Sequence, residues 1–293
     1  NWYGLPESLD NATILRTDAV QNYLGGGLVG RLQFEDAVLD KASARLDYFS
    51  DAHGSSEIRG VLKPQFGFDI AGEKVRTAVI VDYMNGSFEK NLEDTSALNY
   101  SFLNLGLSPS ILILRDDLEL SLGATVYYSM DSESSDSSVF VYPNIEASYR
   151  VAGEYFIAYA GLKGDLKQNN YKDIVNENPF VSPTLTIAPT NNQYKATLGI
   201  KGKLSEVVSY NLNGNYANSE NQLLFKSNPN RFAIGGDFED YEYGNSFGVL
   251  YDNISTVSFF GELNFDVSKR LRLTANAEYF SYEAIAILMF ATM

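Results

Sequence analysis

The stretch Tyr194-Lys195-Ala196-Thr197-Leu198-Gly199-Ile200-Lys201-Gly202-Lys203-Leu204 decides the fold class of this chain. Alternate positions place Tyr, Ala, Leu, Ile, Gly and Leu on one face and Lys, Thr, Gly, Lys and Lys on the other. Because successive side chains of a β-strand point to opposite faces, the stretch predicts a strand with one apolar and one polar face.

The same alternation recurs in about twelve stretches, each roughly ten residues long. The stretches form pairs joined by short turns at Ala71-Gly72-Glu73, Arg115-Asp116-Asp117, Ala152-Gly153-Glu154, Ser205-Glu206 and Ser268-Lys269. Longer polar segments separate the pairs at roughly 85–97, 130–138, 166–192 and 217–248. This layout predicts an all-β fold, an antiparallel transmembrane β-barrel of at least about twelve strands, with short periplasmic turns and long extracellular loops.

The two ends of the chain are less regular. Strands are expected at 28–34 and 42–49, whereas residues 1–27 read as a loop, with a turn at the glycine run 24–28. Residues 284–293 are apolar on nearly every side, and the start lacks a signal peptide. We therefore expect one domain over 1–293, incomplete at both ends.

The composition excludes several classes of protein. The chain has 37 acidic and 22 basic residues, a net charge of −15, which opposes a nucleic-acid partner. Cysteine is absent, so disulfides and cysteine-ligated metals are excluded. The mean hydropathy of −0.17 argues against a helical membrane protein. It is compatible with a barrel, because only every second strand residue faces lipid.

Polar residues at alternate positions of the later stretches identify the expected interior surface. They form rows that a dry core could not easily satisfy. We expect them to line a wet or plugged lumen: Lys195, Lys201, Lys203, Asn211, Asn213, Asn215, Arg272, Asn276 and Glu278.

No residue carries a strong catalytic or metal-binding signal. His53 is the only histidine, and a loop position explains it as well as catalysis does. The pairs Asp116-Asp117 and Glu239-Asp240 suit polar turns and loops. The acidic segments 131–136 and 237–242 offer oxygen ligands for calcium, but solvated loops explain them too. The sequence thus predicts no catalytic residue, metal or cofactor.

Three prolines interrupt the segment Asn176 to Thr190, with apolar residues between them. Such a loop is stiff, because proline fixes its own φ. We expect it to cap the rim of the barrel, fold into its mouth or hold a partner.

Four stretches carry a resemblance to a known group of proteins: Asn1-Trp2-Tyr3-Gly4, Phe140-Val141-Tyr142-Pro143-Asn144, Glu177-Asn178-Pro179-Phe180-Val181-Ser182-Pro183-Thr184-Leu185 and Gly199-Ile200-Lys201-Gly202-Lys203-Leu204. They resemble outer-membrane barrel proteins of Bacteroidota that are commonly labelled TonB-dependent receptor. The likeness covers most of residues 1–282. It implies a Gram-negative outer-membrane location and further strands before Asn1.

The sequence therefore favours a non-enzymatic outer-membrane β-barrel for uptake or passage of a solute, with the lipid bilayer as its surroundings. The alternative is a barrel subunit that acts as scaffold or accessory for other outer-membrane or periplasmic proteins. A secreted adhesive β-sandwich would need two dry inner faces, which the Asn and Lys rows oppose. An enzyme inside the barrel ranks below these.

Overall fold

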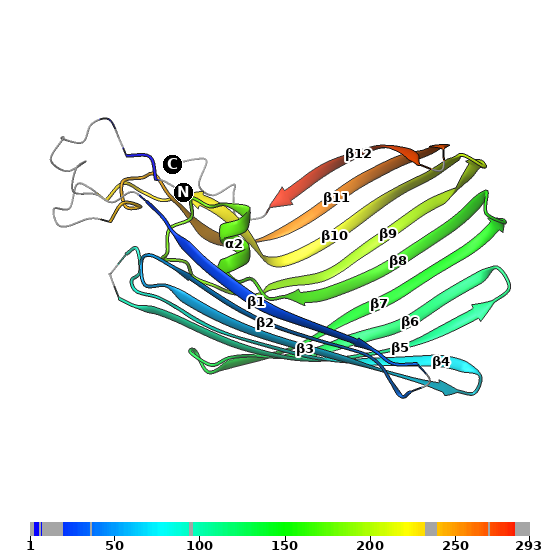
Figure 1. Ribbon diagram of the computed structural model, residues 1–293, viewed down its shortest axis with the longest axis horizontal. Helices are drawn as coiled ribbons and strands as arrows, with labels where there is room; N and C mark the ends of the chain where they lie inside the picture. Colours follow the sequence, from blue (N-terminus) through cyan, green and yellow to red (C-terminus); the bar gives the residue numbers. More distant parts are fainter. Residues whose placement is uncertain are drawn as a thin grey trace.

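The computed structural model describes residues 3–5, 7, 20–35, 37–93, 96–231, 239–268 and 270–284. They form one twelve-stranded antiparallel sheet in which each strand pairs with its neighbours in sequence (Figure 1). The all-β antiparallel prediction is confirmed. The strands are β1 (Tyr23–Gln33), β2 (Leu39–Asp51), β3 (Ser56–Ile70), β4 (Glu73–Phe88), β5 (Leu98–Arg115), β6 (Leu118–Asp131), β7 (Asp136–Ala152), β8 (Phe156–Lys167), β9 (Thr190–Ser205), β10 (Val208–Ser227), β11 (Phe247–Ser268) and β12 (Leu271–Ala284).

The sheet curves into a trough, with β1 and β12 as its two edges (Figure 1). Within the described ranges, neither edge strand pairs with a further strand. Strand β12 is exposed along nearly its whole length, on both faces, because only one neighbour covers it.

The connections between strands differ at the two ends of the trough. At the turn end, β3 to β4, β5 to β6 and β9 to β10 are joined by two residues each, at the predicted places. Ala71 and Gly72 have φ of +52° and +85°, as a two-residue hairpin turn of type I′ requires. The other end, the loop end, carries the longer connections 89–97, 168–189 and 228–246.

Two segments predicted as long loops are shorter in the structure, because the flanking strands extend into them. Strands β6 and β7 leave only residues 132–135 between them, and β10 extends to Ser227. These strand ends break the apolar alternation that marks the middle of each strand. The strand ends predicted from periodicity therefore fall too early. Backbone pairing continues to Asp131↔Asp136 and to Ser227↔Phe247.

The glycine run predicted as a turn is part of β1. Gly25 pairs with Phe49 of β2, and Gly27 pairs with Asp47. A Cβ on Gly27 would lie 2.7 Å from Oδ1 of Asp47, and one on Gly25 would lie 3.1 Å from the Phe49 ring. The glycines are needed because the side chains of β2 lie over this part of β1.

The convex face of the trough is apolar. Leu198 is 71% exposed and Leu212 is 47% exposed, and they lie on this face with Val141, which is 67% exposed. From β3 to β11 the central positions of the same face carry no Lys, Arg, Asp or Glu. No described helix is long and apolar enough to cross a bilayer.

The concave face holds an insert, which we define as helix α2 (Tyr171–Glu177) and residues 178–189. Figure 1 shows α2 inside the trough near the loop end. The insert contributes Tyr171, Ile174, Val175, Val181, Leu185 and Ile187 to a hydrophobic cluster. Inward residues of β2, β4 and β5 complete it: Phe49, Met84, Phe88, Tyr100 and Phe102.

Candidate functional site

Strand register places the predicted polar residues on the concave face. Lys201 of β9 pairs with Asn211 of β10, which pairs with Glu262 of β11. Glu262 in turn pairs with Asn276 of β12, so one row crosses four strands. Neighbouring rows on this face hold Lys195, Lys203, Asn213, Asn215, Arg272 and Glu278. Their role in lining a passage stays a prediction.

The asparagines of β10 form a hydrogen-bonded band along this wall. Asn215 Nδ2 donates to Asn213 Oδ1 at 2.9 Å and to Ser258 Oγ at 3.1 Å. Thr197 Oγ1 donates to Asn215 Oδ1 at 2.7 Å. The Tyr159 hydroxyl donates to Asn211 Oδ1 at 2.6 Å. The amides are thus held in place, because Asn211 and Asn215 have partners on other strands and Asn213 is bonded to Asn215.

The predicted charged residues differ in their contacts. Lys203 forms an ion pair with Glu154, and Arg272 forms one with Asp266, both near the turn end. Lys201 Nζ lies 5.4 Å from the centre of the Tyr159 ring, within range of a cation–π contact. Lys195, Asn276 and Glu278 make no side-chain hydrogen bond or ion pair with other described residues.

A hollow of about 680 Å³ lies on the turn-end half of this wall. Its lining includes Arg150, Lys201, Lys203, Asn211 and Glu262, so it carries both signs of charge. Three of the nine residues predicted to line a lumen therefore meet in one depression, whereas those of β12 lie at the exposed edge.

A second hollow, of about 270 Å³, is lined by four basic residues of β1, β2 and β3: Arg31, Arg45, Arg59 and Lys63. Arg59 donates to both carboxylate oxygens of Asp82, at 2.9 and 2.7 Å. No described acidic residue forms an ion pair with Arg31 or Lys63, so the hollow is net basic. Arg59 and Lys63 lie four residues apart and therefore share one face of β3, which is the signal available in the sequence.

The insert is anchored to the wall by a buried carboxylate. Glu57 of β3 is 4% exposed and accepts hydrogen bonds from the backbone N–H groups of Tyr171 and Lys172, at 2.7 and 3.4 Å. The Tyr100 hydroxyl donates to the same carboxylate at 2.9 Å. Glu57 therefore occupies the start of α2, where free N–H groups favour negative charge.

Further polar contacts hold the insert on several sides. The Tyr171 hydroxyl donates to Asp51 Oδ2 at 2.7 Å, and Lys172 Nζ donates to Asp47 Oδ1 at the same distance. The Tyr3 hydroxyl donates to the carbonyl oxygen of Val181 at 2.6 Å. Burial raises the pKa of the Tyr171 hydroxyl well above its usual value. Of the alternatives for this proline-rich segment, the structure shows folding into the mouth of the trough.

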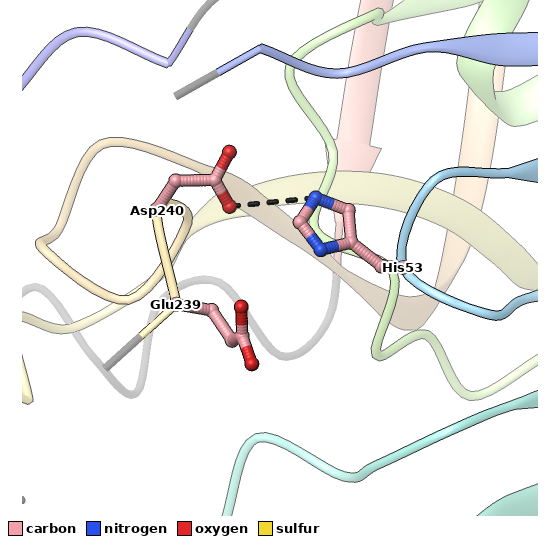
Figure 2. Close-up of side chains that lie close together, drawn as sticks. All are labelled: His53, Glu239 and Asp240. Carbon is pink, nitrogen blue, oxygen red and sulfur yellow. Dashed lines mark ion pairs between the residues drawn. The ribbon is translucent and has the colours of Figure 1, made fainter. Parts of the chain in front are cut away.

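The loop end also brings His53 next to two carboxylates (Figure 2). His53 Nε2 lies 3.4 Å from Asp240 Oδ1, and Glu239 extends beside them. The ring of Tyr241 packs edge-on against the imidazole, with 5.1 Å between ring centres. Sequence reasoning weighed His53 and the 237–242 segment separately, since nothing local indicates that they meet.

Comparison with known proteins supports the fold rather than a family. No family model matches this chain, and no curated protein sequence does. The siderophore receptor PirA from Pseudomonas aeruginosa superposes with a TM-score of 0.59 and 13% identity, over 90% of this chain and 50% of PirA.

Two further structures give the same result. The outer membrane transporter YddB from Escherichia coli has a TM-score of 0.56 and 11% identity, over 90% of this chain and 42% of its own. The copper transporter OprC has a TM-score of 0.54 and 12% identity, over 90% and 46%. The chain spans half or less of each structure.

Proposed function

We propose that this protein is a non-enzymatic, TonB-dependent-receptor-like β-barrel of a Gram-negative outer membrane, acting in uptake or passage of a solute. The two-faced sheet carries the proposal. An uncharged apolar convex face suits lipid, and a polar concave face suits water or a polar solute. The folds of PirA and YddB support the same reading.

The interior wall gives the proposed passage its chemistry. Lysine, arginine, asparagine and glutamate side chains of β7 to β11 surround the 680 Å³ hollow. Such a wall can exchange hydrogen bonds with a hydrated solute at little desolvation cost. The insert narrows the loop end, so passage depends on whether it stays packed.

Purified protein in planar bilayers or vesicles tests the proposal. We expect association with lipid after carbonate washing and conductance or solute entry above empty vesicles. A Lys201→Glu variant should change ion selectivity toward cations, while Leu204→Ala on the convex face should not. Protein that stays soluble without detergent, or selectivity that ignores Lys201, would contradict it.

The alternative is a scaffold or accessory subunit in an outer-membrane protein complex. The insert favours it, because it fills part of the mouth of the trough. Partners that co-purify in detergent, combined with no conductance, would select this function.

A further inference from the structure

The loop end gathers three side chains that can bind a metal ion. One ligand atom from each of His53, Glu239 and Asp240 lies within 4.8 Å of the other two. A common point then exists within about 2.8 Å of each, and zinc binds imidazole nitrogen and carboxylate oxygen at about 2.0–2.2 Å. Side-chain movements below about 1 Å would therefore bring all three atoms to bonding distance, and water can supply the fourth ligand on the open side.

Two of the three proposed ligands, Asp240 and His53, are buried, whereas the third, Glu239, borders the solvent. The Asp240 side chain is 1% exposed and that of His53 is 15% exposed, whereas Glu239 is 47% exposed. His53 Nε2 is buried and makes no hydrogen bond within the described residues. Its 3.4 Å distance to Asp240 exceeds the 2.7–2.9 Å of a charge-assisted hydrogen bond. A cation between the two atoms would coordinate both.

The local charge balance leaves room for a cation. Lys90 Nζ lies 3.1 Å from Glu239 Oε1 and 3.6 Å from Glu242 Oε2. Arg231 lies 3.5 Å from the other oxygen of Glu242. Among the described residues, Asp240, Glu239 and Glu242 thus bring three carboxylates to this group beside Lys90 and Arg231. Lys90 occupies one oxygen of Glu239, which leaves Oε2 for a metal ion.

We propose that His53, Glu239 and Asp240 bind a divalent transition-metal cation of the zinc type. The bound ion cross-links the β2–β3 turn to residues 239–246. One imidazole with two carboxylates is a ligand set that zinc, copper and nickel accept, whereas calcium and magnesium take oxygen ligands. The sequence predicted no metal site, because its ligands come from segments far apart in the chain.

The composition makes the proposal unusually easy to test. The chain has one histidine and no cysteine. Any metal centre that shows imidazole nitrogen coordination must therefore use His53. A calcium site formed only by acidic loops would show none.

The experiment uses the full chain in detergent, stripped with a chelator and freed of affinity tags that contain histidine. Zn²⁺ is titrated by calorimetry, and Cu²⁺ serves as an electron paramagnetic resonance probe for nitrogen ligands. The variants are His53→Gln, Asp240→Asn and Glu239→Gln. Glu133→Gln, in the other acidic turn, is the matched control. Circular dichroism checks that each variant keeps its strand content.

We expect one Zn²⁺ per chain, nitrogen coupling in the Cu²⁺ spectrum, and affinity at least about tenfold lower in each of the three variants. The Glu133→Gln protein should bind like the unmodified chain. Affinity that His53→Gln leaves unchanged, the absence of a Cu²⁺ nitrogen signal, or no Zn²⁺ binding by the folded chain would overturn the proposal. If His53→Gln fails to fold, the exposed Glu239→Gln decides the outcome. Conductance is a separate measurement, so failure here leaves the proposed passage function intact.

Discussion

At the scale of single residues, the contact between β1 and β2 requires glycine at positions where a side chain would collide with β2. A Cβ on Gly27 would meet Asp47 Oδ1 at 2.7 Å and the Leu46 carbonyl at 3.0 Å, whereas one on Gly26 would meet nothing within 4 Å. Asp47 also holds Lys172 of the insert. The structural need for glycine is therefore specific to one face of the strand.

This difference predicts unequal effects of alanine at the two glycines. Gly27→Ala should destabilise the protein by about 1–3 kcal/mol, because backbone or Asp47 must move. Gly26→Ala should have little effect and serves as the control. Thermal unfolding followed by circular dichroism in detergent measures both. Equal shifts of the two midpoints would contradict the assignment.

Glu57 is a second residue on which local structure depends, because it anchors the insert to the sheet. Glu57→Ala removes the acceptor for two backbone N–H groups of α2 and for the Tyr100 hydroxyl. Leaving buried donors without a partner costs about 1–3 kcal/mol. We expect faster amide hydrogen exchange in residues 168–189, measured by mass spectrometry. Glu154→Gln, on the exposed turn end, should leave that exchange unchanged, and an unaffected insert in Glu57→Ala would refute the anchor.

At the scale of elements, the insert acts as a partial closure of the loop end. Replacing residues 170–187 by a short Gly/Ser linker should raise conductance in planar bilayers, because α2 and its hydrophobic contacts leave the trough. The strands keep their pairing, so strand content by circular dichroism serves as the control. Conductance that stays the same after replacement would show that the insert does not restrict passage.

Buried tyrosine makes the insert sensitive to alkaline pH. Burial raises the pKa of Tyr171 in the folded protein above its unfolded value of about 10, so folding disfavours ionisation of its hydroxyl. This stabilisation is complete below pH of about 10 and is lost as the pH rises from there toward the folded pKa. Hydrogen exchange of 168–189 should therefore accelerate above that pH more than its intrinsic rate, and less so in Tyr171→Phe.

At the scale of the whole molecule, the two faces of the sheet must behave differently toward charge. A lysine at the bilayer midplane costs about 2–4 kcal/mol on a lipid-facing position. Leu198→Lys should therefore reduce folding into vesicles, whereas Thr197→Lys, its neighbour on the concave face, should be tolerated. Protease protection and heat-modified gel mobility measure the folded fraction. Equal tolerance would mean that the convex face does not contact lipid.

Local sequence determined the strands and their two faces. The alternation around Leu198 and Leu212 predicted the convex positions that the structure exposes, and residues such as Lys201 and Asn211 were placed together on the other face. This works because the period of two is a property of each strand alone. Where the alternation fades, as in Gly25 to Gly27 and beyond Tyr216, the predicted boundaries were wrong.

Only the tertiary structure decided what fills the mouth of the trough. Glu57 contacts the start of α2 although 114 residues separate it from Tyr171, and His53 contacts Asp240 from a distant part of the sequence. No local pattern marks such pairs, because the curvature of the whole sheet sets which loop-end residues approach one another. The sequence by itself thus determined the strands of the sheet and their two faces. Long-range packing determined the position of the insert and the contacts at the loop end.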